Sequence, residues 1–253
     1  MRRIKLIVAY DGTEYSGWQI QPEAPTIEMY LDKAIRELTG ENVHVTGASR
    51  TDAGVHAYGN VAVFDTESTI PGDRFTFALN RFLPDSIVIQ DSWEVSGDFH
   101  PRHCNTRKTY EYRILNTAVP LPQKRNFTWH VAGSVDIEKM KEAAAYIVGE
   151  HDFKSFCCVR TQAESTVRTI YSLEVLQEGS EIIIRIKGNG FLYNMVRIIT
   201  GTLIQVGKGR FKPEYVKQML EEKDRTVAGQ TAPPQGLTLV GIEYVDNDDA
   251  RVV

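Results

Sequence analysis

The spacing of apolar and polar residues divides the first half of the chain into strands and helices in a mixed order. Residues 3–10 alternate as a strand does and end at the turn signal Asp11-Gly12. Thr26 is a suitable N-cap for a helix ending at Leu38, because apolar residues recur there every three or four positions. The remaining pattern predicts strands at 43–46, 60–64 and 86–93 and a helix at 71–82.

The second half of the chain repeats this rhythm. The predicted elements are, in order, a strand at 108–115, a helix at 137–148 capped by Asp136, a hairpin of 167–176 and 181–187 around Gly179, an apolar helix at 192–206, a helix at 213–220 and a strand at 237–245. Strands and helices mixed at this spacing predict an α+β chain with two related halves around an extended antiparallel or mixed sheet. The pattern turns polar near residues 99–106, where we place the boundary.

Composition narrows the class of protein. With 253 residues, 42% hydrophobic and 25% charged, the chain is typical of a soluble globular protein. No apolar run approaches the length that spans a bilayer, and the first residues do not resemble a signal peptide. Three cysteines, two of them adjacent, match neither a metal-ligand nor a disulfide spacing, which indicates a reducing cytoplasm.

The net charge of −4 argues at first against a nucleic-acid partner. However, the acidic residues cluster late in the chain, whereas basic residues gather at 2–5, 102–113, 124–125 and 208–212. Local basic patches, rather than the charge of the whole chain, decide whether phosphates bind. Scattered surface charge remains the better explanation of any single patch.

The most informative segment is 47–57, GASRTDAGVHA. Small residues surround Asp52, so that backbone or ligand can approach it closely. A polar loop that carries Arg50, Asp52 and His56 between two apolar strands is a common location for a functional site. An Arg–Asp ion pair that closes a tight turn explains the same residues about equally well.

Three other segments carry candidate chemistry. Residues 10–22 form an aromatic and amide-rich loop, suited to stacking on bases or to filling the core with Trp18. Residues 230–237 form a Pro/Gly-rich turn that shapes a pocket wall or merely redirects the chain. In residues 99–112, basic side chains precede a strand that carries two tyrosines on one face. Contact with RNA explains this pattern, and packing of the tyrosines in the core explains it equally well. The residues concerned are Arg102, Arg107, Lys108, Tyr110 and Tyr112.

Arg197 lies inside the apolar helix predicted at 192–206. A buried guanidinium is costly without a carboxylate partner, and Asp52 is a candidate because an arginine would keep a buried aspartate ionised. An arginine that extends along the helix surface to solvent explains the residue slightly better on sequence alone.

Several chemistries are excluded. The chain has no Walker loop, no dinucleotide fingerprint and no paired-histidine zinc motif. His56 near Ser49 is a weak signal for a serine nucleophile, because no oxyanion signature accompanies it. One carboxylate remains, as nucleophile or base, with basic and aromatic residues around it.

The 47–57 segment resembles the active-site motif of the bacterial tRNA pseudouridine synthase A family. YDGTEYSGWQIQP, FHPRHCNTRKTYEYRI, EHDFKSFC, GNGFLYNMVRIITGTL and TAPPQGLTL resemble further segments of that family, in its order. The resemblance implies the pseudouridine synthase fold, with two RNA-binding-like (ferredoxin-like) halves. Residues 1–104 would carry the catalytic Asp loop, and residues 105–253 would complete the active-site cleft.

The resemblance also implies an activity. It implies conversion of uridine to pseudouridine at positions 38, 39 and 40 of the tRNA anticodon stem-loop, by a cytoplasmic homodimer that uses no cofactor. Asp52 would be the nucleophile, attacking the ribose anomeric carbon or the uracil ring, and Tyr110 would stack on the target base. Arg197 would pair with Asp52, Arg50 would fill the space of the flipped-out nucleotide, and Leu237 would pack against the base. RNA contacts are expected from Arg102, Arg107 and Lys108.

Two other classes of function are alternatives to a uridine isomerase. A non-catalytic RNA-binding module on the same scaffold would explain the basic and aromatic residues, but phosphate binding gains nothing from the carboxylate of Asp52. A glycoside hydrolase needs two carboxylates across the scissile bond, and the motif loop offers one.

Overall fold

The structure, a computed structural model, describes residues 1–158 and 163–245. Its chain forms two compact units, one of Met1–Thr106 with the strand from Thr238 onward, and one of Arg107–Leu237. The division expected at residues 104 and 105 assigned the last strand to the second half. The structure instead groups it with the first unit, because Thr238 and Leu239 pair in parallel with His56 and Ala57.

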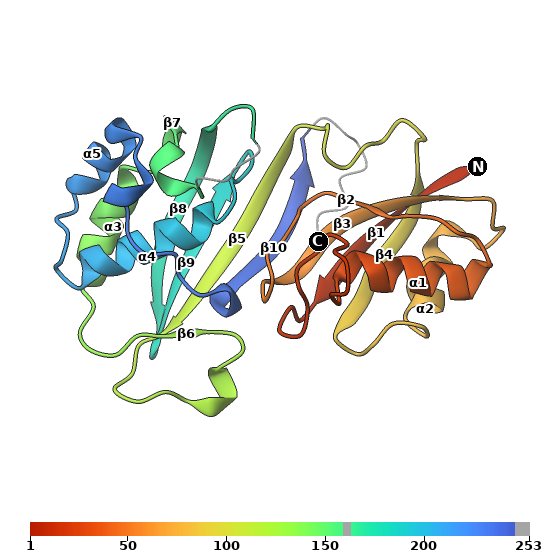
Figure 1. Cartoon of the computed structure of the whole chain (residues 1–253), viewed down its shortest axis with the longest axis horizontal. Coiled ribbons are helices and arrows are strands. Elements are labelled where there is room, and N and C mark those ends of the chain that lie inside the picture. Colours follow the sequence, from red (N-terminus) through yellow and green to blue (C-terminus); the bar gives the residue numbers. More distant parts are fainter. Residues whose placement is uncertain (159–162, 246–253) are drawn as a thin grey trace. The chain divides into compact units, whose positions relative to one another are not determined.

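The first unit is a mixed sheet with two helices (Figure 1). Its elements are β1 (Arg2–Tyr10), α1 (Ile27–Thr39), β2 (Thr46–Gly47), β3 (His56–Thr66), α2 (Phe75–Leu79), β4 (Ile87–Val95) and β10 (Leu237–Tyr244). The strand order is β4-β1-β3-β10, with β1 antiparallel to both β3 and β4 and with the short β2 on β3. Ile4 opposes Phe64, and Phe64 meets Phe75 of α2 at a ring distance of 5.3 Å.

The sheet of the first unit has a second apolar face. Successive residues of a strand point to opposite faces, so Lys5 and Ile7 lie opposite the face that Ile4 and Leu6 turn to the helices. The cluster on this second face contains Ile7, Ala48, Val61, Val63, Trp93, Val95, Phe99 and Tyr244. Phe99 belongs to the loop after β4, which therefore packs on the sheet and is part of the core.

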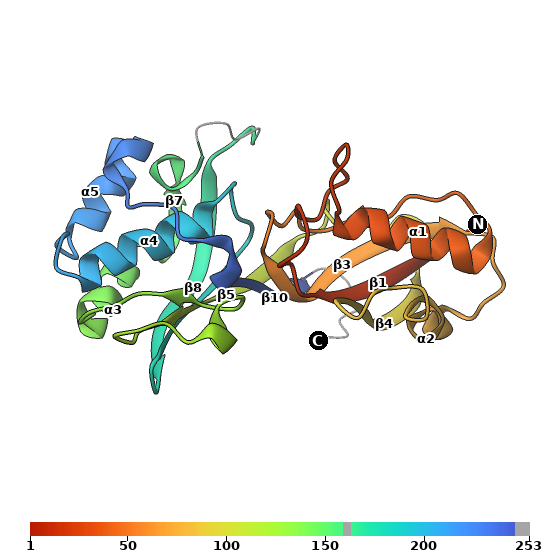
Figure 2. The same cartoon turned by 60° about the horizontal axis from the view of Figure 1, so that its bottom comes forward.

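The second unit is a sheet, antiparallel except for the short β6 beside β5, with helices on one side, as Figure 2 shows for α3, α4 and α5 beside β8. Its elements are β5 (Thr106–Leu115), β6 (Trp129–His130), α3 (Ile137–Ala145), β7 (Gly149–Asp152), β8 (Val167–Glu178), β9 (Glu181–Gly188), α4 (Met195–Gly207) and α5 (Tyr215–Glu222). Strands β5, β9, β8 and β7 are neighbours in that order. Most side chains of α4 are buried, so it is the central helix of this unit.

The structure confirms the α+β class and most of the predicted elements. Thr26 caps α1 by accepting a hydrogen bond from the Met29 amide, Asp136 caps α3, and the hairpin turns at Gly179 with φ +58°. The strand predicted at 43–46 was wrong except at its end, because β2 consists of Thr46 and Gly47 alone. Strand β3 begins four residues before its predicted start, so His56 and Ala57 of the motif belong to the sheet.

Candidate active site

The Asp52 loop lies between β2 and β3 and is tied to the first unit through its backbone. The Ala48 amide donates to the Val61 carbonyl over 2.7 Å, and the Trp18 amide donates to the Thr51 carbonyl over 3.1 Å. The Val55 amide donates to the carbonyl of Asp52 itself over 3.2 Å. Asp52 is half-buried and forms part of a tight turn. A loop held at this many points presents its carboxylate in a defined position.

Two glycines, Gly17 and Gly47, let the 10–22 loop pack closely against the Asp52 loop. A Cβ atom at Gly47 would lie 2.3 Å from the indole of Trp18, and a Cβ atom at Gly17 would lie 2.6 Å from the Thr51 carbonyl oxygen. Gly17 also has φ +94°, which glycine adopts without strain. Trp18 is fully buried. The interpretation that Trp18 fills the core is therefore confirmed. Its buried indole packs against the start of the Asp52 loop.

Buried polar side chains support the same loop from below. Tyr10 and Thr51 share a hydrogen bond of 2.7 Å between their hydroxyls. The amide of Asn60 donates to the Ser49 carbonyl over 2.9 Å. All four side chains are buried, and buried polar groups are expensive to leave unpaired, so these bonds specify one loop conformation.

Two arginines stand beside this loop. Arg50 is exposed, and Arg102 donates from Nε to the Gly47 carbonyl oxygen over 2.6 Å. Desolvation and the nearby positive charge of Arg50 lower the pKa of Arg102 below its ordinary value. Two like charges so placed favour an anion between or beside them. The structure therefore brings Arg102, which is 55 residues from Gly47 in sequence, to the start of the Asp52 loop.

His56 is the next-to-last residue of the motif, and its side chain contacts other parts of the first unit. It is buried, and its Nδ1 accepts a hydrogen bond of 3.0 Å from the Gly12 amide. Asp11 Oδ1 lies 3.1 Å from the same nitrogen. His56 thus joins the start of β3 to the turn after β1.

In the second unit, Tyr110 lies on β5 with its ring buried. It is 7% exposed and meets Phe191 edge to face at a ring distance of 5.2 Å. Tyr112, on the same face of β5, donates from its hydroxyl to the Pro233 carbonyl over 2.7 Å. Burial raises the pKa of the Tyr112 phenol far above its usual range, against a smaller opposing effect of Arg197.

Arg197 is half-buried and holds the 230–237 turn. Its Nε donates to the Ala232 carbonyl over 2.7 Å, its Nη1 donates to Asn194 Oδ1 over 2.7 Å, and its own carbonyl accepts from the Ala232 amide. The turn approaches α4 so closely that a Cβ at Gly201 would meet the Gln230 carbonyl. Leu237, which follows this turn, is buried.

Two guanidinium atoms of Arg197, Nε and Nη1, therefore donate to acceptors within the second unit. The predicted pairing with Asp52 joins residues of different units and stays a prediction, and so does the contact of Tyr110 with the target base. Within the second unit, the 188–195 segment links the predicted residues, because Phe191 contacts Tyr110 and Asn194 contacts Arg197.

The remaining basic candidates lie at the start of β5. The guanidinium of exposed Arg107 stacks over the ring of Tyr171 at 5.2 Å, and Lys108 is half-buried. Cation–π stacking restrains Arg107 while leaving its charge at the surface.

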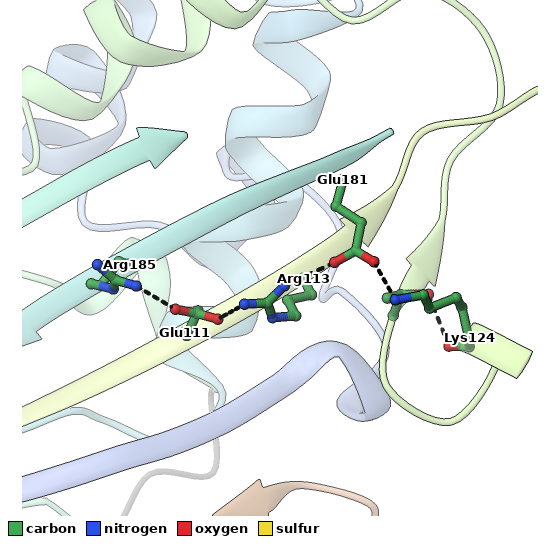
Figure 3. Close-up of polar contacts among 6 residues, drawn as sticks. Glu111, Arg113, Lys124, Glu181 and Arg185 are labelled. Carbon is green, nitrogen blue, oxygen red and sulfur yellow. Dashed lines mark hydrogen bonds and ion pairs between the residues drawn. The ribbon is translucent and has the colours of Figure 1, made fainter. Parts of the chain in front are cut away.

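A ladder of ion pairs crosses β5 and β9 on the face of the sheet that the helices leave open (Figure 3). The chain of contacts runs from Arg185 to Glu111 (2.8 Å), Arg113 (2.7 Å), Glu181 (2.9 Å) and Lys124 (2.8 Å). Both glutamates are less than 10% exposed. Burial alone would raise the pKa of Glu181, but hydrogen bonds from Lys124 and Arg113 hold it below its usual value. Lys124 is thus committed to an ion pair.

Among residues 1–158 and 163–245, no three or more His, Cys, Asp or Glu side chains are grouped to hold a metal ion. The helices in this part of the chain are too short or too polar to cross a bilayer.

The sequence pattern did not single out Tyr10 and Asn60 as supports of the Asp52 loop. Each lies on a predicted strand, at a position that faces the interior. A polar residue at such a position indicates a buried hydrogen bond, and the sequence did contain this signal. Their partners come from distant segments, and a single sequence does not pair them.

The chain is similar in sequence to known proteins over nearly its whole length. A family model described as tRNA pseudouridine synthase matches residues 6–103 and 143–245. The chain is 51% identical over 245 residues to tRNA pseudouridine synthase A of Ruminiclostridium cellulolyticum, covering 96% of this chain and 100% of the relative. It is 49% identical over 244 residues to that of Thermoanaerobacter sp. (strain X514), with the same coverage. For Brevibacillus brevis the identity is 47%, again with 96% and 100% covered. The chain therefore belongs to the tRNA pseudouridine synthase family of isomerases.

Proposed function

We propose that this enzyme converts uridine to pseudouridine at positions 38, 39 and 40 of the tRNA anticodon stem-loop, with Asp52 as nucleophile and without a cofactor. The observation that carries the proposal is the Asp52 loop, a single carboxylate held by backbone and buried side-chain hydrogen bonds beside two arginines. Structural ion pairing does not need so rigid a support, whereas attack on a bound nucleotide does.

The reaction is an isomerisation, so all atoms of uridine except one proton are retained. The Asp52 carboxylate attacks either the ribose anomeric carbon, which expels uracil, or the uracil ring. The bond between N1 and the ribose breaks, the base rotates, and C5 forms the new bond to the ribose. On the ribose route the carboxylate leaves the anomeric carbon as the C5 bond forms, and on the uracil route it leaves the ring afterwards. The C5 proton is lost and N1 takes up a proton. Because the detached base must not be lost to water, the site has to close around it.

The target nucleotide must leave the helical stack before a carboxylate can reach it. Arg50, exposed and two residues from Asp52, is the side chain we assign to the vacated space. We assign Tyr110 to stacking on the base and to helping remove the C5 proton, and Leu237 to packing against the base. Arg197 would pair with Asp52 and keep it ionised.

The RNA backbone is assigned to Arg102, Arg107 and Lys108. An acidic protein can bind a tRNA arm through one basic surface, since a stem is recognised by its shape and phosphates. We further propose that the enzyme is a cytoplasmic homodimer. The family resemblance supports the dimer, and three free thiols are in keeping with a reducing compartment. Sedimentation equilibrium at micromolar concentration tests the dimer, which a monomer mass would contradict.

The positional assignment is tested with tRNA transcripts that keep one uridine among positions 38, 39 and 40. Each is incubated with pure protein, and pseudouridine is mapped by carbodiimide modification and primer extension. Modification at all three positions, and at none outside the anticodon arm, is expected. Modification confined to another arm would contradict the proposal. Tight binding of every transcript without any modification would instead support the non-catalytic RNA-binding module.

A further inference from the structure

Lys5 is a buried lysine enclosed by aromatic rings. It lies in the middle of β1 and is 3% exposed. Its Nζ is 4.8 Å from the ring centre of Trp93, 4.8 Å from that of Phe99 and 4.4 Å from that of Tyr244. An ammonium taken out of water loses hydration, and ring faces at these distances replace part of that interaction.

The three rings come from three separate segments of the first unit. Trp93 is the neighbour of Lys5 on β4, Tyr244 ends β10, and Phe99 lies in the loop that follows β4 (Figure 1). Phe99 also meets Tyr244 edge to face at 5.1 Å. The ammonium of Lys5 therefore joins this loop to the sheet.

Other bonds fasten the same loop at neighbouring residues. Arg3 donates to the Phe99 carbonyl over 2.9 Å, and the Tyr244 hydroxyl donates to the Pro101 carbonyl over 3.2 Å. The next residue, Arg102, holds the Gly47 carbonyl at the start of the Asp52 loop. A continuous series of contacts thus runs from Lys5 through Phe99 to Gly47, all within the first unit.

We propose that Lys5 is a positioning residue for catalysis, which anchors the 97–104 loop so that Arg102 is placed on the Asp52 loop. This inference rests on the proposed function, since it concerns how the Asp52 loop is held. Lys5 does not touch the substrate. Its effect passes through Arg102, so the two residues should be coupled in activity although neither contacts the other in the bonds described above.

The test compares Lys5→Met, which keeps an unbranched side chain one atom shorter and removes the charge, with Lys5→Arg, which keeps a cation among the rings. Lys33→Met is the matched control, because Lys33 is an exposed lysine of α1 in the same unit. Lys5→Met should lower kcat/KM for tRNA by about ten- to a hundredfold, as small displacements of catalytic groups do. Lys5→Arg should recover most of the loss, and Lys33→Met should behave as wild type.

A double-mutant cycle with Arg102→Gln separates positioning from general stability. If Lys5 acts through Arg102, Lys5→Met costs little further activity once Arg102 is replaced. Losses that multiply in the double variant would overturn the proposal.

Limited trypsin digestion supplies a readout that does not depend on activity. Lys5→Met should speed cleavage after Arg102 by about tenfold while leaving cleavage after Arg125, an exposed arginine of the second unit, unchanged. Equal acceleration at both sites would show a global loss of stability and overturn the proposal. If wild-type protein modified no tRNA, the proposed function would fail, whereas this digestion would still decide whether Lys5 anchors the loop.

Discussion

The hydroxyl oxygens of Tyr10 and Thr51 lie 2.7 Å apart in the interior of the first unit. This hydrogen bond joins the last residue of β1 to the residue before Asp52. The backbone next to Asp52 is thereby attached directly to the sheet of the first unit. The position of the Asp52 carboxylate accordingly depends on buried side chains of that unit.

Thr51→Val should weaken both the fold and the activity. The change keeps the shape of the side chain and removes the bond to Tyr10, which should lower the free energy of unfolding by about 1–2 kcal/mol. Because the adjacent Asp52 shifts, kcat should fall about tenfold. Urea unfolding and pseudouridine formation measure the two effects. The control is Thr39→Val, which removes a hydroxyl bond at the far end of α1, about 18 Å along the helix from its first residue. Equal kcat values in both variants would contradict this role of Thr51.

Gly47→Ala should be strongly disruptive and Gly97→Ala nearly neutral. An alanine Cβ at residue 47 would meet the buried ring of Trp18 at 2.3 Å, whereas residue 97 has open space around it. The first change should cost about 1–3 kcal/mol through overpacking and should displace the Asp52 loop. Thermal unfolding and kcat compare the two variants. Similar unfolding temperatures and kcat values for both variants would show that the Trp18 ring moves aside without cost.

The ion-pair ladder should make the second unit sensitive to acid through Glu181. The folded pKa of Glu181 lies below its ordinary value of 4.5, so the unfolded state binds the proton more tightly. The stabilisation is therefore fully present above about pH 4.5 and is lost as pH falls through the folded pKa.

Glu181→Gln should lower the free energy of unfolding at pH 7 by about 1–3 kcal/mol, and the difference from wild type should shrink as the pH approaches 4. Urea unfolding followed by circular dichroism across this range measures it. Glu178→Gln, at an exposed position of the same hairpin, is the control and should change little at any pH. A Glu181→Gln difference independent of pH would contradict the ladder.

Tyr110→Phe should separate stacking from proton removal. The variant keeps the ring against Phe191 and loses the hydroxyl, so the KM for tRNA should stay within about twofold while kcat falls at least about tenfold. Steady-state kinetics measure both quantities. An unchanged kcat would limit Tyr110 to stacking, and a raised KM alone would point to a binding role for the hydroxyl.

Local chemistry made much of the fold predictable from sequence. The capping residues Thr26 and Asp136 and the turn at Gly179 act within a few residues of the elements they bound. The short β2 escaped prediction, because residues 43–45 look like a strand and yet only Thr46 and Gly47 find a partner on β3. Strand pairing is a property of distant segments, which apolar spacing does not reveal.

The same limit applies to the site. The motif around Asp52 predicts a functional carboxylate from local residue types and spacing, and that role stays a prediction. The contact of Arg102 with Gly47 and the ring of aromatic groups around Lys5 unite segments that lie far apart in sequence. Such supports become visible once the sheet has been assembled.

The most direct test of the central claim is tritium release from tRNA labelled at C5 of uridine, measured for wild-type protein and for Asp52→Asn. The change is isosteric and removes the nucleophilic charge, so tRNA binding measured by filter retention should stay within a few-fold of wild type. The account predicts steady release by wild-type protein and none above background by Asp52→Asn. Appreciable turnover by the pure variant would contradict the assignment of Asp52 as the nucleophile.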